Sequence, residues 1–169
     1  FNDLLVNDTG VWLTNRAQDN FVRDNRMAAN SKLGAWVERA SGTRIENNEI
    51  IGTAGEGVAL EGANGNVVSG NFMEDNGGGG ILIGLTTSGV PGNVGLGSND
   101  NTVEGNTLWE SGGDAIEIEG SSITVSTGNQ LIDNFARASN GDGISLNYAR
   151  DTLVKDNDVT ANKGGIGFK

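Results

Sequence analysis

A short acidic segment, GGDAIEIEG at Gly112–Gly120, places three carboxyl groups within six residues, those of Asp114, Glu117 and Glu119. Paired carboxylates can serve as general acid and general base when their environments separate their pKa values. Alternation of glutamates with isoleucines is equally typical of a strand that buries one face and exposes the other to water. The segment alone supports both interpretations, so the elements around it must decide.

The composition excludes several kinds of chemistry. The 169 residues include no histidine and no cysteine, which excludes histidine-based catalysis, disulfides and thiolate ligands. The 22 Asp and Glu residues outnumber the 11 Lys and Arg residues, giving a net charge of −11. That charge argues against nucleic acid as a partner, and more weakly against polyanionic substrates unless a local basic patch is present. No apolar run is long enough for membrane insertion.

A repeat of about 23 residues runs through most of the chain. Its most regular column is Asn25, Asn48, Asn71, Asn106, Asn134 and Asn157. Asp, Asn or Gly precedes each of these asparagines, and these residue types tolerate left-handed turns. The residues three before and two after each asparagine are apolar. Several columns that repeat in one register indicate stacked structural units.

Each repeat also carries a pair of inward-facing aliphatic residues on a third short segment. These pairs are Val58/Leu60, Ile81/Ile83, Ile116/Ile118 and Ile144/Leu146, with Ala35/Val37 as a weaker member. Three short alternating segments per repeat predict an all-β fold, a single-stranded parallel β-helix of six to seven coils with three strands per coil. We expect residues 1–169 to form one β-helix domain, a fragment or processed piece of a longer β-helix, with an insertion loop at about 85–98. The asparagine columns should hydrogen-bond from coil to coil.

These repeats resemble those of the pectin-lyase-like superfamily. The resemblance lies in NxVxxN segments at Asn66–Asn71 and Asn101–Asn106, in GEGVAL at Gly55–Leu60 and in GDGISL at Gly141–Leu146. It implies a right-handed helix and a secreted, extracellular or cell-surface protein. The superfamily includes polysaccharide lyases, glycoside hydrolases, epimerases, tailspikes and non-catalytic surface proteins, so the fold leaves the reaction open. Its histidine-containing sites have no counterpart here. No cofactor is expected, although Ca²⁺ is compatible with the acidic residues despite the lack of a clear motif.

The alternation predicts which side chains point outward from the strand that carries the paired aliphatic columns. One outward column contains Trp36, Ala59, Leu82, Glu117 and Ser145, and the other contains Glu38, Glu61, Gly84, Glu119 and Asn147. The candidate catalytic residues are Glu117, Glu119, Asp114 and Glu61. The candidate substrate-binding residues are Trp36, Glu38, Arg39, Asn147, Tyr148, Arg150 and Asp142.

Each candidate also has a simpler explanation. Outward strand positions must be polar in a soluble rod, and Asp114 and Asp142 are residue types common in turns. Trp36 is harder to explain in this way, because the repeat gives it no packing partner. Trp109 points outward from a different strand, where we expect it to meet a neighbouring domain or subunit.

Three functions are compatible with this pattern. The first is a carbohydrate-active protein that binds an extended polysaccharide or oligosaccharide along the outward face and, if catalytic, uses hydrolase-type carboxylate chemistry. Transglycosylation by the same carboxylates and a lyase reaction using Tyr148 or Arg150 are the other enzymatic options. The second is a structural or adhesive rod, as in a filament, tailspike or surface protein. The third is a non-catalytic glycan-binding module. Partners other than glycans would be a second copy, end-to-end or side-by-side, or the rest of a longer chain.

Overall fold

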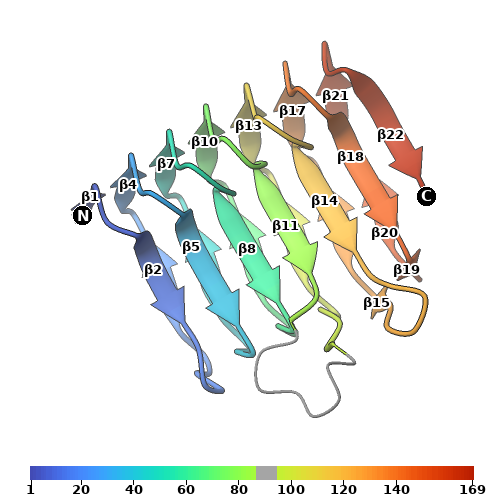
Figure 1. The fold of residues 1–169 in the computed structure, drawn as a ribbon, viewed down its shortest axis with the longest axis horizontal. Helices are drawn as coiled ribbons and strands as arrows, with labels where there is room; N and C mark the ends of the chain where they lie inside the picture. The colour runs from blue at the N-terminus through green and yellow to red at the C-terminus, as the bar shows by residue number, and fades with distance from the viewer. Residues whose placement is uncertain (87–94) are drawn as a thin grey trace.

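The computed structural model describes residues 1–86 and 95–169. These residues form a parallel β-helix in which each coil adds a strand to three sheets (Figure 1). Two sheets have seven strands and the third has six, which confirms the prediction of six to seven coils with three strands each. No helix among the described residues is long and apolar enough to cross a membrane.

We number the three large sheets in chain order. Sheet 1 contains β1 (Asp3–Leu5), β4 (Arg26–Ala28), β7 (Glu49–Ile51), β10 (Phe72–Glu74), β13 (Thr107–Trp109), β17 (Phe135–Arg137) and β21 (Asp158–Thr160). Sheet 2 contains β2 (Thr9–Leu13), β5 (Leu33–Glu38), β8 (Val58–Glu61), β11 (Ile81–Gly84), β14 (Ile116–Glu119), β18 (Asp142–Asn147) and β22 (Gly164–Phe168). Sheet 3 contains β3 (Phe21–Arg23), β6 (Arg44–Glu46), β9 (Val67–Ser69), β12 (Thr102–Glu104), β16 (Gln130–Ile132) and β20 (Leu153–Lys155). A two-stranded sheet pairs β15 (Ser126–Thr127) with β19 (Ala149–Arg150).

The strand register agrees with the columns of the repeat. In sheet 2, Val58 pairs with Ile81, Ile81 with Ile116 and Ile116 with Ile144. The first and last coils are offset by one residue from the 23-residue repeat. Trp12 pairs with Trp36, a spacing of 24 residues, and Ile144 pairs with Ile166, a spacing of 22.

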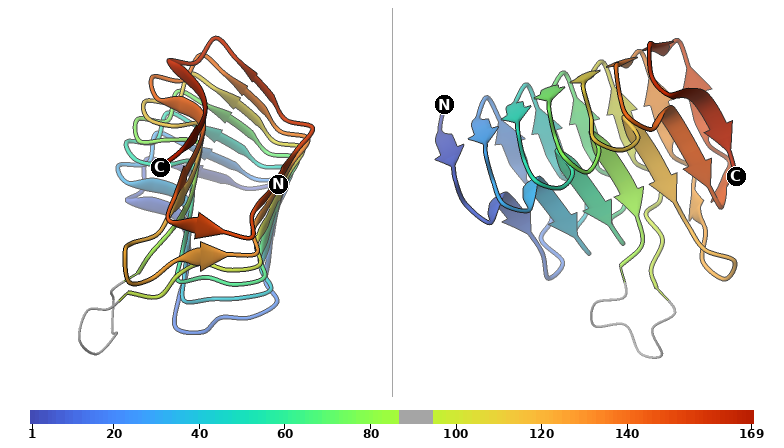
Figure 2. Two further views of the ribbon diagram at one scale, coloured as in Figure 1. Left: turned by 90° about the vertical axis from the view of Figure 1, so that its right-hand side faces the viewer. Right: turned by 45° about the horizontal axis from the view of Figure 1, so that its top comes forward.

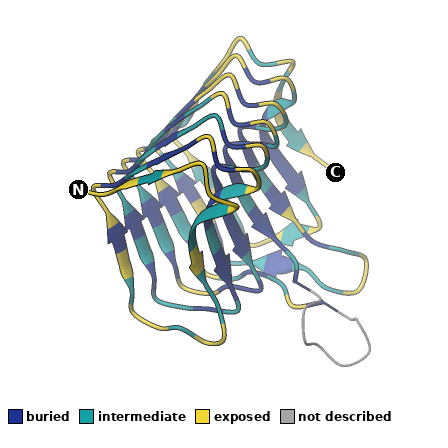
Figure 3. Ribbon diagram, turned by 60° about the vertical axis from the view of Figure 1, so that its left-hand side comes forward, coloured by how far each residue is buried: buried dark blue, intermediate teal, exposed yellow. Residues whose placement is uncertain are grey.

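The apolar columns fill the interior enclosed by the three sheets (Figures 2 and 3). In sheet 1, Met27, Ile50, Met73 and Leu108 lie one above another and are fully buried. A single coil cannot enclose such a core, so its apolar side chains are removed from water only when neighbouring coils cover them.

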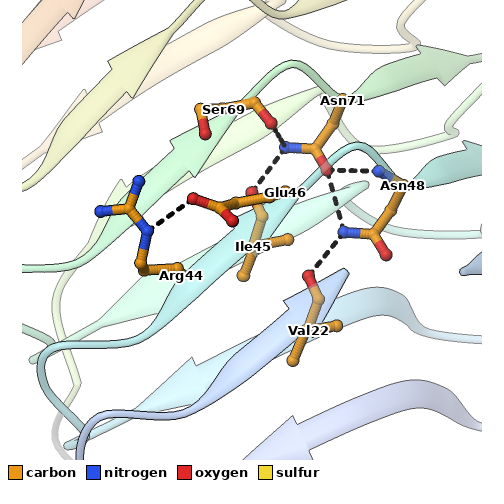
Figure 4. Close-up of polar contacts among 7 residues, drawn as sticks. All are labelled: Val22, Arg44, Ile45, Glu46, Asn48, Ser69 and Asn71. Carbon is orange, nitrogen blue, oxygen red and sulfur yellow. Dashed lines mark hydrogen bonds and ion pairs between the residues drawn. The ribbon is translucent and has the colours of Figure 1, made fainter. Parts of the chain in front are cut away.

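The asparagine columns join the coils by hydrogen bonds (Figure 4). The backbone N–H and the side-chain Nδ2 of Asn48 both donate to Oδ1 of Asn71, at 2.9 and 3.0 Å. Asn71 Nδ2 in turn donates to the carbonyl of Ile45 and to Oδ1 of Asn106. The same contacts continue through Asn134 and Asn157, and a second column links Asn66, Asn101 and Asn129. Buried amides are thereby satisfied at the turns, where the strand ladder is interrupted.

The residue before each asparagine has the left-handed conformation that the sequence predicted. Its φ lies between 52° and 63° in every coil, at Asp24, Asn47, Gly70, Gly105, Asp133 and Asp156. Gly, Asn and Asp adopt this region more readily than other residues, which explains why these three types occupy the column.

The expected insertion at about 85–98 lies partly outside the described residues, since 87–94 are not described. On either side of this segment, Thr86 and Leu96 form an antiparallel bridge with N···O distances of 3.2 and 2.8 Å. Ser98 is buried and donates its hydroxyl to the carbonyl of Gly84. The chain on both sides of the segment is therefore tied to the coils beside β8 and β11 (Figure 1).

The ladder makes a prediction about stability. Replacing Asn71 by alanine removes the acceptor of the Asn48 N–H and Nδ2 groups and a donor to the Ile45 carbonyl. We expect a loss of unfolding free energy on the order of 3 kcal/mol, measured by chemical denaturation. Asn140→Ala, at an exposed turn, is the control and should change stability by less than about 0.5 kcal/mol. Equal effects of the two substitutions would contradict a structural role for the ladder.

Candidate functional site

The outward face of sheet 2 carries the two predicted columns in the predicted register. Trp36 pairs with Ala59, which pairs with Leu82, and Leu82 pairs with Glu117. In the other column Glu61 and Glu119 lie on either side of Gly84. Since neighbouring strands are about 4.8 Å apart, the two glutamates begin about 10 Å from each other. Gly84 contributes no side chain between them, and the Leu82 side chain packs beside this glycine.

An acidic hollow of about 250 Å³ opens at the start of the sheet 2 strands. It is lined by Glu56, Gly78, Gly79, Ile81, Leu82, Gly113, Asp114 and Glu117. Gly79 occupies the rung between Glu56 and Asp114 and brings no side chain into this space. A Cβ on Gly79 would lie 2.6 Å from the Asp114 carbonyl oxygen, so only glycine fits there. The glycine thus leaves a gap between carboxylates two coils apart.

Glu117 is a carboxyl group of this hollow with a raised pKa. Partial burial raises its pKa, and the nearby charge of Asp114 raises it further. Asn147 Nδ2 donates a hydrogen bond of 3.1 Å to Glu117 Oε1, which acts in the opposite direction. Glu117 therefore retains a proton at higher pH than an ordinary glutamate does.

Asp114 and Asp142 occupy successive rungs, as expected, and both have specific partners. Asp114 Oδ1 accepts a 2.6 Å hydrogen bond from the backbone N–H of Asp142. Asp142 Oδ2 forms a 2.9 Å ion pair with Lys169, whose Nζ also lies 3.2 Å from the Ser145 hydroxyl. Asp114 is thus held as a hydrogen-bond acceptor beside Glu117, and Lys169 is a neighbour of the site that sequence reasoning missed.

Two tryptophans stack at the first two coils of the same face. The rings of Trp12 and Trp36 are 4.9 Å apart and nearly parallel, at 6°. Trp12 remains 55% exposed, and a hollow of about 320 Å³ beside the pair is lined by Asp8, Thr9, Trp12, Lys32 and Trp36. The expectation that Trp36 has no packing partner is wrong, because the 24-residue step of the first coil places Trp12 over it.

Trp36 is also fixed by a carboxylate. Its Nε1 donates a 3.0 Å hydrogen bond to Glu61 Oε2. Burial raises the pKa of Glu61, although this hydrogen bond opposes the rise. Glu61, predicted as a catalytic residue, therefore also orients the aromatic pair.

Glu38 does not have the exposure that its outward column predicted. Glu38 is only 4% exposed, and its carboxylate accepts hydrogen bonds from the hydroxyls of Thr14 and Thr86. Thr86 begins the inserted segment, so the insertion covers this position. In the structure Glu38 is a buried acceptor, and a direct contact with substrate is not accessible to it.

Arg39 lies in a separate pocket at the turn after sheet 2. This pocket has a volume of about 260 Å³ and is lined by Arg16, Gln18, Arg39, Ala40, Ser41, Gly62, Asn64 and Leu96. Arg16 and Arg39 occupy successive coils, joined by a 3.0 Å hydrogen bond from the Arg16 N–H to the Arg39 carbonyl. The sequence could have predicted the rest of the pocket, because Gln18, Ser41 and Asn64 recur at intervals of 23 residues.

The remaining candidates lie outside these hollows. Glu119 is exposed at the end of β14, Tyr148 is 53% exposed in a left-handed turn with φ of 48°, and Arg150 lies in β19. Trp109 lies on sheet 1, as predicted, and packs edge-on against Phe72 at 5.8 Å. In the described part of the chain, no group of three or more acidic residues is arranged to hold a metal ion.

Comparisons with known proteins identify the repeat. A family model described as "Right handed beta helix region" matches residues 83–169, and one described as "Periplasmic copper-binding protein (NosD)" matches residues 1–94. No curated protein matches the sequence.

Several solved structures share the fold at low sequence identity. The periplasmic alginate epimerase AlgG is 14% identical, with a TM-score of 0.71 over 90% of this chain and 38% of its own. PfbA, a surface adhesin of Streptococcus pneumoniae, is 13% identical, with a TM-score of 0.65 over 92% of this chain and 48% of its own. An alginate lyase from Paenibacillus sp. is 12% identical, with a TM-score of 0.57 over 96% of this chain and 75% of its own. The chain spans less than half the length of the first two.

The raised pKa of Glu117 predicts how stability depends on pH. Between the ordinary glutamate value of 4.5 and its raised pKa, the folded protein holds this proton more often than the unfolded chain. Glu117 therefore favours folding less as pH rises through this interval. We expect Glu117→Gln to raise the unfolding free energy at pH 7, with the gain shrinking towards pH 4. Denaturation of both proteins at the two pH values measures this, and a pH-independent difference would contradict it.

Proposed function

Because the chain belongs to the right-handed β-helix family, we propose that it binds an extended polysaccharide along the outward face of sheet 2. We further propose that Glu117 and Asp114 hydrolyse the bound chain at the acidic hollow. The observation that carries this proposal is the combination of one half-buried carboxyl group with raised pKa and a second carboxylate beside it in an open hollow.

The binding part of the proposal rests on the side chains of this face. Trp12 offers an exposed ring surface on which the apolar face of a sugar can pack. Asn147 and Asp142 provide amide and carboxylate groups for sugar hydroxyls, since each presents more acceptors than its internal hydrogen bonds use. These groups follow several coils of one sheet, which suits a linear ligand better than a compact one.

The catalytic part follows from the two carboxyl groups. A carboxyl group whose pKa is raised above the ordinary glutamate value can donate its proton to the glycosidic oxygen as the bond to the leaving sugar breaks. Asp114, held in place by the Asp142 N–H, would activate the water molecule or attack the sugar carbon directly. In the first route Asp114 takes a proton from the attacking water, and this proton returns through solvent to Glu117. In the second, a water molecule that gives its proton to Glu117 breaks the covalent bond between the sugar and Asp114, so either route consumes one water molecule.

The structural comparisons support a carbohydrate-related role. Two of the three structures described above are named for acting on alginate, and the third is a surface adhesin. One is called periplasmic and another a surface protein, so we place this chain outside the cytoplasm. At 14% identity or less these likenesses establish the fold alone, and the choice of hydrolysis rests on the carboxyl groups of this chain.

Copper, named in one family description, does not suit the residues present. The sequence has no histidine or cysteine, and its only thioethers are Met27 and Met73. Both methionines are fully buried in the core column, where Ile50 separates them. We therefore assign no copper site to this chain.

The binding proposal predicts the effect of removing the exposed ring. Trp12→Ala should weaken oligosaccharide binding about tenfold, or about 1.4 kcal/mol, because a sugar-stacking surface is lost. Isothermal titration with the oligosaccharide selected by a glycan array measures this effect. Trp109→Ala, which removes an exposed ring from sheet 1, is the matched control and should leave the affinity unchanged. The proposal is wrong if the two substitutions weaken binding equally.

The catalytic proposal predicts loss of turnover without loss of fold. Glu117→Gln and Asp114→Asn should each lower the hydrolysis rate at least about a hundredfold while keeping oligosaccharide affinity within a few-fold. Product formation is followed by chromatography, and circular dichroism checks the fold. Glu104→Gln, an exposed residue of sheet 3, is the control. Full activity in both site variants would refute the assignment, even if binding persisted.

A further inference from the structure

We propose that the pocket around Arg16 and Arg39 is an oxyanion-binding site that seats a carboxylate or sulfate group carried by the polysaccharide. This inference rests on the proposed function, because it names the chemical class of the ligand that the outward face of sheet 2 would bind. The pocket is distinct from the acidic hollow and would select charged sugars over neutral ones.

The side chains of the pocket match what an oxyanion needs. Arg16 and Arg39, from successive coils, line the same volume of about 260 Å³. A guanidinium group presents a planar set of N–H donors that fits carboxylate or sulfate oxygens in pairs. Gln18, Ser41 and Asn64 form the neighbouring column and add further donors beside the arginines. Gln18, Ser41 and Asn64 lie on successive coils, as do Arg16 and Arg39, so coil stacking fixes their relative positions.

The charges of the pocket contrast with those of the whole chain. With a net charge of −11, the protein repels anions over most of its surface. Among the described residues that line this pocket, none is acidic and two are arginines. The ion pairs of the described residues do not include Arg16. The local basic patch that a polyanionic ligand requires is therefore present at this turn.

The third coil closes one side of the pocket. Gly62 follows Arg16 and Arg39 in the same turn column, with φ of 58°, and it carries no side chain. The Thr86 side chain and Leu96 pack against this glycine instead. Leu96, exposed to 42%, borders the pocket, so the volume beside the two arginines has a wall on the side of the third coil.

The position of the pocket relative to the acidic hollow favours a long ligand. Arg39 directly follows β5 at the end of a sheet 2 strand, whereas Asp114 precedes β14 at the start of one. The two places differ by about six strand positions, or roughly 20 Å along the strand direction, and by three coils. A free inorganic anion would use only the pocket, whereas a charged polysaccharide of several units could occupy the pocket and the hollow together.

The test compares ligands that differ only in charge. An oligouronate, its methyl ester, a sulfated oligosaccharide of similar length and sodium sulfate are titrated into the full chain by calorimetry. We expect the oligouronate or the sulfated oligosaccharide to bind at least about tenfold more tightly than the neutral ester. Arg16→Gln combined with Arg39→Gln should remove this preference while leaving the affinity for the neutral ester unchanged. Arg137→Gln, an exposed arginine of sheet 1, is the control and should have no effect.

Each outcome separates this inference from the proposed function. If neutral and charged oligosaccharides bind equally and the arginine variants change neither, the oxyanion site is refuted while glycan binding stands. If sodium sulfate alone binds and the arginine variants abolish that binding, the pocket is an anion site and the polysaccharide as its ligand is refuted. If neither sodium sulfate nor any charged oligosaccharide binds, the inference is overturned.

Discussion

The hydrogen bond between asparagines of neighbouring coils is the interaction on which the rest of the structure depends. A β-helix turns its chain sharply at every corner. The Asn47 and Glu49 N–H groups still donate to backbone carbonyls of neighbouring coils there, but the N–H of Asn48 between them donates to a side chain. Asn71 shows how this is resolved, because its Oδ1 receives two donors from Asn48 while its Nδ2 reaches the Ile45 carbonyl. An unsatisfied buried polar group costs about 1–3 kcal/mol, so the repetition of this arrangement over several coils is a large contribution. It also fixes the register, since a shifted coil would separate each amide from its partners.

Fixed register explains why a site can form on this surface. Once coils are in register, every outward position becomes a column with side chains about 4.8 Å apart. A column of identical charges at this spacing would repel. In sheet 2, Gly84 separates Glu61 from Glu119, whereas Glu38 and Glu61 are direct neighbours, and each of these two carboxylates accepts a hydrogen bond. Gly79, between Glu56 and Asp114, leaves a gap between carboxylates two coils apart. The gap beside Gly79 is the acidic hollow, where Asp114 raises the pKa of Glu117.

Most of the fold could be predicted from the sequence, because the columns that form the core are also the columns that repeat. The pairs Ile81/Ile83 and Ile116/Ile118 lie in register as their spacing indicated, and the left-handed turns occur where Asp, Asn and Gly recur. For the candidate site, the sequence predicted which face of the β-helix carries it but not which of its side chains are accessible. Outward direction follows from alternation, but exposure depends on what lies over each position. Glu38 points outward and is nevertheless buried, because the threonine hydroxyls of two other segments cover it.

Where the repeat is irregular, the regular spacing did not predict which side chains meet. The first coil has one extra residue, and this single step places Trp12 over Trp36. The pocket of Arg16 and Arg39 forms at a turn, where strand alternation makes no prediction. Its second column of Gln18, Ser41 and Asn64 was therefore not predicted. In each case a contact between coils, rather than the pattern within one coil, decides what a side chain does.

The three tryptophans allow the most direct test of whether sheet 2 presents the glycan-binding face. Two of them, Trp12 and Trp36, lie on that face, whereas Trp109 lies on sheet 1. Their indole N–H signals can be followed by nuclear magnetic resonance while the oligosaccharide favoured by a glycan array is added. If sheet 2 binds the glycan, the signals of Trp12 and Trp36 shift with ligand concentration and the Trp109 signal stays in place. A shift of Trp109 alone, or no shift of any indole signal, would contradict it.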